Sequence, residues 1–243
     1  MLRPRFYTAQ GLETGTLGLE KEPSRHIAKA LRMRAGDALC LFDGSGREGH
    51  GEITAVERDA VQVHVTRVSE VDRESPLAVS LAISLSRGDR VDTIVQKATE
   101  LGVTTIRPFI SERTGVRLDP ARLAKKRDHW QKIALSACEQ CGRNVVPEVR
   151  PVAPYADVLT GCQELPGLRL ILQPTGDTKA LPPQCESICL LVGPEGGFSD
   201  PEVQAAIDAG FTSLQLGPRI LRTETAPLAA IAVAQARWGD LLA

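Results

Sequence analysis

Three glycine- and proline-rich segments of the sequence combine residue types that could hold a small ligand. They are "LQPTG" (172–176), "VGPEGG" (192–197) and "LGPRILRTETA" (216–226). Each follows a short apolar run. Glycine permits a sharp turn, or the close approach of a flat ligand to bare backbone N–H and C=O groups, and proline stiffens the turn. The pattern favours a binding site built from main chain, although tight turns without a ligand would explain either glycine loop alone.

The third segment also carries side chains suited to acid–base chemistry. Helix capping explains Thr225 and is compatible with Thr223, but it gives no reason for Arg222 and Glu224. The phosphate-loop pattern G-x-x-x-x-G-K-[ST] is absent from the sequence, and the dinucleotide pattern G-x-G-x-x-G does not occur in these three segments. The hydrolase patterns H-E-x-x-H and G-x-S-x-G are absent as well.

The elements around these segments predict an α/β domain. Apolar runs predict buried strands, and amphipathic patterns predict helices. The strands are expected at 77–85, 104–110, 169–174, 187–193 and 212–217, and the helices at about 89–102, 120–140, 200–210 and 226–242. Gly102, Gly142 and Gly210 are expected to end the first three helices. Ser199 and Glu202 form a capping-box pattern. Alternating strands and helices imply a mostly parallel sheet, whose ligands bind beyond the carboxyl ends of the strands. All three segments lie at such ends.

The first 70 residues have a different, β-rich pattern. Apolar residues alternate through Val61, Val63 and Val65, a glycine-rich turn covers 43–46, and one helix is expected from a Ser24 cap onward. This pattern predicts a small barrel-like domain, followed by the linker "SEVDRESP" (69–76). We therefore expect two domains, residues 1–72 and residues 73–243.

The charge and hydropathy of the chain indicate whether it binds nucleic acid or a membrane. The net charge is −1, so the whole chain gives no basic signal for nucleic acid, but Arg25, Lys29, Arg32 and Arg34 lie in a stretch without acids. That stretch is either a footprint for a polyanion or a solvated helix face. There is no window of 18 apolar residues and no apolar core for a signal peptide, so we expect a cytoplasmic protein and no membrane partner.

The six cysteines are expected to be reduced thiols in that compartment. The spacing of Cys138 with Cys141, and of Cys185 with Cys189, suggests zinc ligands. However, the first pair lies inside a helical pattern, and Cys189 lies inside an apolar run. We therefore expect no metal site.

The motifs "LVGPEGGFSDPEV" and "LGPRILRTETAPLAAIA" closely resemble the two C-terminal motifs of the RsmE family. These proteins are S-adenosylmethionine-dependent methyltransferases of the SPOUT superfamily, which methylate uridine N3 in 16S ribosomal RNA. "KATELGVTTIRPF", "ERT" (112–114), "ACEQCGRNVVPEV", "LRMRAGDALCLFDGSG" and "RPRFY" extend the resemblance over nearly the whole chain. Cys141 and Gln173 depart from the residues usual in the family, which puts any special role of these two side chains in doubt.

The resemblance implies a PUA-like N-terminal domain, a C-terminal α/β domain tied in a trefoil knot, and a homodimer. It also implies S-adenosylmethionine as the cofactor. For Glu195, cofactor contact and loop support are both open. The implied cofactor-binding residues are Leu172, Gln173, Pro174, Val192, Gly193, Pro194, Glu195, Gly196, Gly197, Leu216, Gly217, Ile220, Leu221, Thr225 and Ala226.

The implied reaction requires a proton to leave the uracil imino nitrogen, because the protonated nitrogen is a poor nucleophile. Arg222 is the candidate cation that stabilises or orients the uracil. Glu224 is the candidate base, or the group that orients Arg222, and it could equally support the loop.

The implied RNA substrate is 16S ribosomal RNA, within the small ribosomal subunit. The candidate RNA-binding residues are Arg3, Arg5, Arg25, Lys29, Arg32, Arg34, Arg113 and Arg117. Two alternatives stay open. One is another SPOUT methyltransferase, which acts on transfer RNA or a different ribosomal site. The other is a non-catalytic RNA-binding or ribosome assembly factor.

Overall fold

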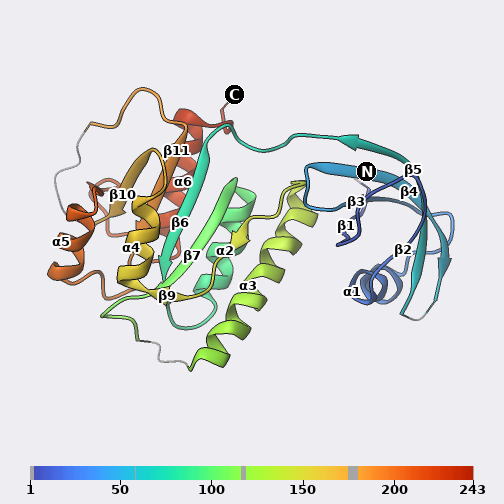
Figure 1. Ribbon diagram of the computed structural model, residues 1–243, viewed down its shortest axis with the longest axis horizontal. Coiled ribbons are helices and arrows are strands. Elements are labelled where there is room, and N and C mark those ends of the chain that lie inside the picture. The colour runs from blue at the N-terminus through green and yellow to red at the C-terminus, as the bar shows by residue number, and fades with distance from the viewer. Residues whose placement is uncertain (1–2, 58, 116–118, 175–179, 243) are drawn as a thin grey trace. The chain divides into compact units, whose positions relative to one another are not determined.

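The computed structural model describes residues 3–57, 59–115, 119–174 and 180–242 (Figure 1). The chain divides into two compact units. The first comprises residues 1–74 and 138–146, and the second comprises residues 75–137 and 147–243. Residues 138–146 therefore join the first unit, although they lie far along the chain from the predicted N-terminal domain.

The first unit is built on a five-stranded sheet. Its strands, in spatial order, are β1 (Arg5–Tyr7), β3 (Ala38–Phe42), β4 (Arg47–Val56), β5 (Val61–Glu70) and β2 (Gly15–Gly18). All the pairs are antiparallel except β1 with β3. The predicted glycine-rich turn separates β3 from β4, and the alternating valines of β5 are buried together with Phe6 and Leu39. β5 also takes up the first two residues of the predicted linker.

The helix of the first unit begins earlier than the sequence predicted. α1 (Lys21–Arg25) starts at Lys21 and continues into a π-helical segment, η1 (His26–Leu31). Ser24 lies inside α1 and does not cap it. Its buried Oγ donates to Leu19 O and accepts from Val61 N, both at 3.1 Å. The Ser24 prediction was wrong because the hydroxyl ties the helix to β5, a contact that local sequence does not show.

The second unit contains a parallel sheet, as predicted. Its order is β12 (Thr212–Leu214), β10 (Leu168–Leu172), β11 (Ser187–Val192), β6 (Ala78–Ser84), β7 (Val103–Ile110) and β8 (Glu148–Val149), with β9 (Ala153–Pro154) also paired with β7. Every pair between these strands is parallel. Their carboxyl ends therefore lie along one edge, where the three glycine-rich segments begin.

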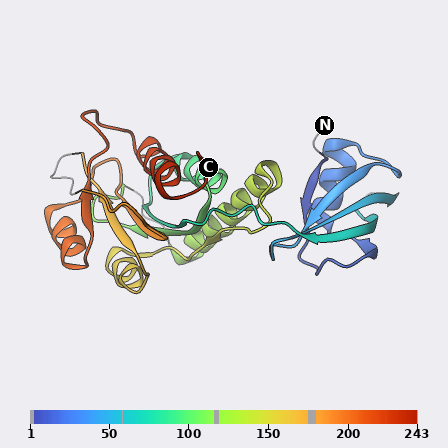
Figure 2. The ribbon, with the colours of Figure 1, turned by 90° about the horizontal axis from the view of Figure 1, so that it is seen from above.

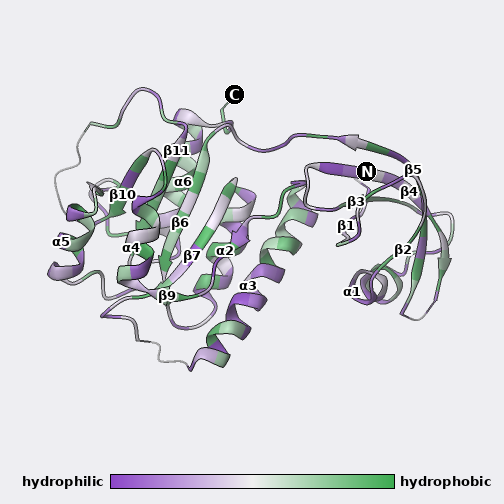
Figure 3. Cartoon of the chain, in the orientation of Figure 1, coloured by the Kyte–Doolittle hydropathy of each residue, from purple (hydrophilic) through white to green (hydrophobic). Residues whose placement is uncertain are grey.

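Helices cover both faces of this sheet. They are α2 (Arg90–Glu100), α3 (Pro120–Cys141), α4 (Tyr155–Gln163), α5 (Asp200–Asp208) and α6 (Thr225–Trp238). α2 and α6 lie on one face, and α4 and α5 lie on the other (Figure 2). A core of Phe109, Ile171 and Phe198 lies beneath α4 and α5. α3 carries both hydrophilic and hydrophobic residues (Figure 3), and its buried residues Trp130, Ala134 and Ala137 recur at helical spacing, as expected for a helix with one solvated face.

Some helix ends follow the sequence and others do not. α2 and α5 end just before Gly102 and Gly210, both of which have positive φ, as the sequence predicted. At α6 the N-cap position belongs to Glu224, so the expected capping by Thr225 was wrong. α4, β8 and β9 had no counterpart in the sequence analysis. No helix among the described residues is both long and apolar enough to cross a membrane.

Candidate active site

A cavity of about 370 Å³ opens where three neighbouring strands of the second unit end. β10 ends at Leu172, β11 at Val192 and β12 at Leu214, and all three residues line the cavity. Its size lies in the range of small-molecule sites, and the carboxyl edge of a parallel sheet is where such sites occur. The fold therefore brings the three glycine-rich segments together around one space.

The residues predicted to bind a cofactor gather at this cavity, with one exception. All of them line it except Thr225, which is not among the described lining residues. Six further lining residues were not predicted to bind the cofactor. One of them, Arg113, was predicted to bind RNA. The six are Arg113, Phe198, Leu214, Gln215, Arg219 and Thr223. Leu214, Gln215, Arg219 and Thr223 lie within or next to the third segment, so its continuous course along the chain was the available signal.

The glycines of the cavity loops serve different purposes. Gly197 and Gly217 have φ of +68° and +71°, a conformation that disfavours residues with a side chain. Gly193 has a packing role, because a Cβ there would lie only 3.0 Å from Phe198 Cε2. The first two positions therefore shape the turns, and the third makes room for an aromatic ring.

The loop after β7 supports the cavity loop. Arg113 Nη1 donates to Gly196 O at 3.1 Å and to Phe198 O at 3.2 Å. The predicted capping box is present at the start of α5, where Ser199 N donates to Glu202 Oε2 at 3.0 Å. The other oxygen of Glu202 accepts from Glu112 N at 2.9 Å. Arg113, predicted to bind RNA, thus supports the main chain of the cavity wall.

Gln173 offers an unused donor at the cavity. Its backbone N–H donates to Leu214 O at 3.1 Å, which joins the ends of β10 and β12. Its side-chain Nε2 is buried and has no hydrogen-bond partner among the described residues. A buried donor without a partner is costly, so this position favours a ligand with a hydrogen-bond acceptor.

The two predicted catalytic residues lie beside the cavity and are not among its described lining residues. Arg222 is exposed, and its backbone oxygen accepts from the first N–H groups of α6. Glu224 Oε2 lies 3.6 Å from Arg90 Nε. Arg90 also forms an ion pair with Glu195. The sequence analysis did not select Arg90, because neither partner lies near it along the chain.

The predicted RNA-binding residues of the first unit fall into two groups. Arg3, Lys29, Arg32 and Arg34 are exposed, and Arg25 is exposed but paired with Asp59 at 2.7 Å. Arg5 differs, because its side chain is only 11% exposed and it donates to Glu48 and Asn144. Its guanidinium is thus engaged within the first unit, and its contact with RNA stays a prediction. Arg117 lies outside the described residues.

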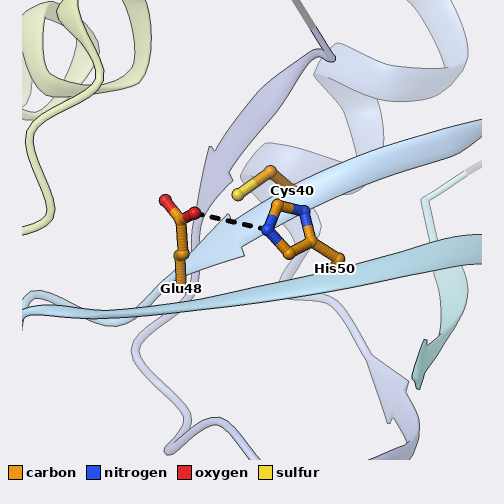
Figure 4. A group of neighbouring side chains, drawn as sticks. All are labelled: Cys40, Glu48 and His50. Atoms are coloured by element: carbon orange, nitrogen blue, oxygen red, sulfur yellow. Dashed lines mark ion pairs between the residues drawn. The ribbon is translucent and has the colours of Figure 1, made fainter. Parts of the chain in front are cut away.

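Cys40, Glu48 and His50 form a group of metal-ligand type in the first unit (Figure 4). However, Arg5 Nη1 lies 3.0 Å from Glu48 Oε2 and 3.3 Å from Cys40 Sγ, and Arg73 Nη1 lies 2.8 Å from the same oxygen. Two guanidinium groups thus already supply the positive charge. Burial raises the pKa of Glu48, but the hydrogen bonds from Arg73 and Arg5 outweigh it and lower the pKa to about 2. The cluster is therefore best described as a buried ion-pair network.

Comparison with known protein families assigns a domain family to each of the two units. Residues 73–235 match the RNA methyltransferase domain family, and residues 19–66 match the PUA domain of RNA methyltransferases. The second unit thus carries an RNA methyltransferase domain, and the first carries its PUA-type companion. These matches confirm the predicted α/β fold with a PUA-like N-terminal domain. The trefoil knot stays a prediction.

Individual relatives show which RNA methyltransferases the chain resembles. Ribosomal RNA small subunit methyltransferase E of Buchnera aphidicola (from Schizaphis graminum) is 35% identical, covering 98% of each chain. The protein of that name from Neisseria gonorrhoeae, solved with S-adenosyl methionine bound, is 42% identical and has a TM-score of 0.89, covering 98% of this chain and 99% of that one. A Legionella pneumophila methyltransferase, solved with the bound cofactor SAM, is 41% identical and has a TM-score of 0.94, covering 99% and 100%.

The chain belongs to the ribosomal RNA small subunit methyltransferase E family. The family membership that the sequence motifs indicated is thereby confirmed.

Proposed function

We propose that this protein transfers a methyl group from S-adenosylmethionine to N3 of a uridine in 16S ribosomal RNA. One observation carries the proposal. The cavity at the ends of β10, β11 and β12 is walled by three glycine- and proline-rich segments, two of which carry the motifs that resemble those of the family. The relatives solved with the cofactor bound support the same choice of ligand.

The residues of the cavity fit this cofactor. The walls offer main-chain groups and apolar side chains, which suit the adenosine portion, and Gln173 Nε2 provides a buried donor with no described partner. We assign to cofactor binding the residues predicted from the sequence that line the cavity. Bound there, S-adenosylmethionine supplies an electrophilic methyl group on a sulfonium.

The chemistry required of the protein is to position the uracil and remove its imino proton. Glu224 is the proposed acceptor of that proton, and Arg222 is the proposed cation that stabilises the uracil oxygens. As the N3–methyl bond forms, the sulfur–methyl bond breaks, and its electron pair stays on the sulfur. Both residues lie on one short loop next to residues that line the cavity, which is why we assign them to the uracil.

The RNA must present this uridine unpaired, because base pairing hides N3. Arg3, Lys29, Arg32 and Arg34 are exposed cations suited to phosphate contacts, and we propose that they belong to the RNA-binding surface. We further propose that the substrate lies within the small ribosomal subunit and that the protein acts in the cytoplasm.

We also propose that the protein is a homodimer. Ile220 lines the cavity, yet it is 85% exposed, and Val233 is exposed on the last helix. A second copy would cover apolar groups of this kind at the edge of the site. Sedimentation at micromolar concentration should give twice the mass of the chain, and a monomer would contradict this proposal.

Substitution of Glu224 tests the catalytic assignment. Glu224→Gln should slow single-turnover methyl transfer roughly 100-fold or more, because a positioned base contributes about that much. The dissociation constant for S-adenosylmethionine, measured by titration calorimetry, should change little. Glu164→Gln, which alters an exposed carboxylate at the end of α4, is the matched control. Lost cofactor affinity together with unfolding would contradict the assignment.

A further inference from the structure

Arg90 makes contacts that the proposed function has not yet used. It is the first residue of α2, directly after the loop that leaves the central strand β6. Its guanidinium pairs with Glu195 through Nη1, and its Nε lies 3.6 Å from Glu224 Oε2. Nη1 also donates to Arg87 O at 3.4 Å. One side chain therefore joins three loops at the carboxyl edge of the sheet.

The two carboxylates belong to different walls of the cavity. Glu195 lies in the loop between β11 and α5 and is itself a lining residue. Glu224 lies in the loop between β12 and α6, directly after Thr223, which lines the cavity. Arg90 is not among the described lining residues. It contacts a carboxylate in each of the two loops, and Glu195 lies 105 residues away from it along the chain.

We infer that Arg90 is a positioning residue, which fixes Glu195 and Glu224 relative to each other and so couples the cofactor loop to the loop of the proposed base. The role of Glu224 in this inference rests on the proposed function. The inference also gives Glu195 a purpose, because its side chain turns to Arg90 and supports the loop.

The chemistry of arginine suits this task. A guanidinium presents several N–H groups in a fixed plane and can bind two carboxylates at once, whereas a lysine ammonium acts as a single point charge. Without Arg90, both carboxylates would lose this cation and would repel an approaching RNA phosphate more strongly. With side-chain exposures of 39% for Arg90, 37% for Glu195 and 27% for Glu224, the arrangement contributes orientation more than stability.

The first arm of the test separates turnover from cofactor affinity. Arg90→Gln should reduce the single-turnover rate on small-subunit RNA about 30-fold, with less than a threefold change in the dissociation constant for S-adenosylmethionine. Arg90→Lys should recover much of the loss. Lys97→Gln removes a cation and an ion pair from the same helix and should leave the rate within twofold. An Arg90→Gln rate equal to that of Lys97→Gln would overturn the inference.

The second arm asks whether Arg90 acts through Glu224. If it does, adding Arg90→Gln to a Glu224→Gln protein should cost less than a further threefold, because the base that Arg90 positions is already gone. Losses that multiply would show that Arg90 acts independently of Glu224, and the inference would fall.

The third arm measures how firmly the two loops are held, and it does not depend on methyl transfer. Amide hydrogen exchange of 193–198 and 219–224 should accelerate at least fivefold in Arg90→Gln and stay unchanged in Lys97→Gln. Unchanged exchange in Arg90→Gln would overturn the inference. If the unaltered protein failed to methylate ribosomal RNA, the proposed function would fail, while the exchange rates would still decide whether Arg90 couples the two loops.

Discussion

Two arginine–glutamate networks in this protein differ chiefly in burial. In the first unit, Glu48 is 7% exposed and receives hydrogen bonds from Arg5 and Arg73. In the second unit, Arg90 joins Glu195 and Glu224, and every member keeps between 27% and 39% exposure. The residue types are the same, but in the first network Glu48 and Arg5 are buried while Arg73 is 40% exposed, whereas the whole second network lies at the rim of a cavity.

Burial determines what each network contributes. A buried carboxylate that loses its partners is left uncompensated in a medium that solvates it poorly, so breaking the buried network should cost stability. An exposed pair is well solvated when broken, so its loss should barely affect folding. We therefore expect the Glu48 cluster to stabilise the first unit and the Arg90 network to act on turnover.

The largest expected effect on stability comes from Glu48→Gln. The substitution leaves Arg5 and Arg73 without their shared counter-charge and should lower the unfolding free energy by about 2 to 3 kcal/mol. Urea unfolding monitored by circular dichroism measures the change. Glu52→Gln, on the exposed side of the same strand, is the control and should cost less than about 0.5 kcal/mol. Equal losses in the two variants would remove the contrast between the networks.

The pH dependence of stability gives the next effect. The pKa of Glu48 is lowered from 4.5 to about 2, so its contribution is full above pH 4.5 and is lost as the pH falls toward 2. A shift of this size corresponds to about 3 kcal/mol at most. The stability difference between the unaltered protein and Glu48→Gln should therefore shrink across this window. A difference that stays constant down to pH 2 would contradict the assignment.

Glu195→Gln tests the other side of the comparison. Because the pair with Arg90 is exposed, the unfolding free energy should change by less than about 1 kcal/mol. The single-turnover rate should nevertheless fall severalfold, because the loop loses its support from Arg90. Parallel unfolding and methyl-transfer measurements decide the matter. A loss of stability as large as that of Glu48→Gln would show that exposure does not distinguish the networks.

The smallest effect concerns cations that belong to neither network. Lys29 is exposed on the helical segment of the first unit. Lys29→Gln should weaken RNA binding modestly and reduce the slope of log affinity against log salt by about 0.7 to 0.9, the value for one phosphate contact. Fluorescence anisotropy over a salt series measures this slope. Lys97→Gln should leave the slope unchanged, and an unchanged slope in Lys29→Gln would exclude it from the RNA surface.

Local sequence patterns predicted much of the second unit. Apolar runs located five of the seven strands of the parallel sheet, all but β8 and β9, and glycines located the ends of α2, α3 and α5. The glycine-rich segments pointed to the cavity because the carboxyl ends of parallel strands share an edge. These features depend on short stretches of chain or on a general rule of topology, and both can be read without coordinates.

The features that the sequence did not reveal depend on partners far apart in the chain. Arg5 looked like a free cation, but Glu48 and Asn144 enclose it. Arg90 looked like an ordinary residue of an amphipathic helix, because its two carboxylates lie more than 100 residues away. Residues 138–146 belong to the first unit for the same reason, because their contacts are with residues far away along the chain.

Mass spectrometry of ribosomal RNA nucleosides tests the central claim most directly. Small ribosomal subunits that lack the modification should be incubated with the protein and S-adenosylmethionine, and their nucleosides compared with those of a reaction without the protein. The account predicts one equivalent of 3-methyluridine, found only when both protein and cofactor are present. Methylation at another position, or no methylated uridine despite cofactor binding, would contradict it.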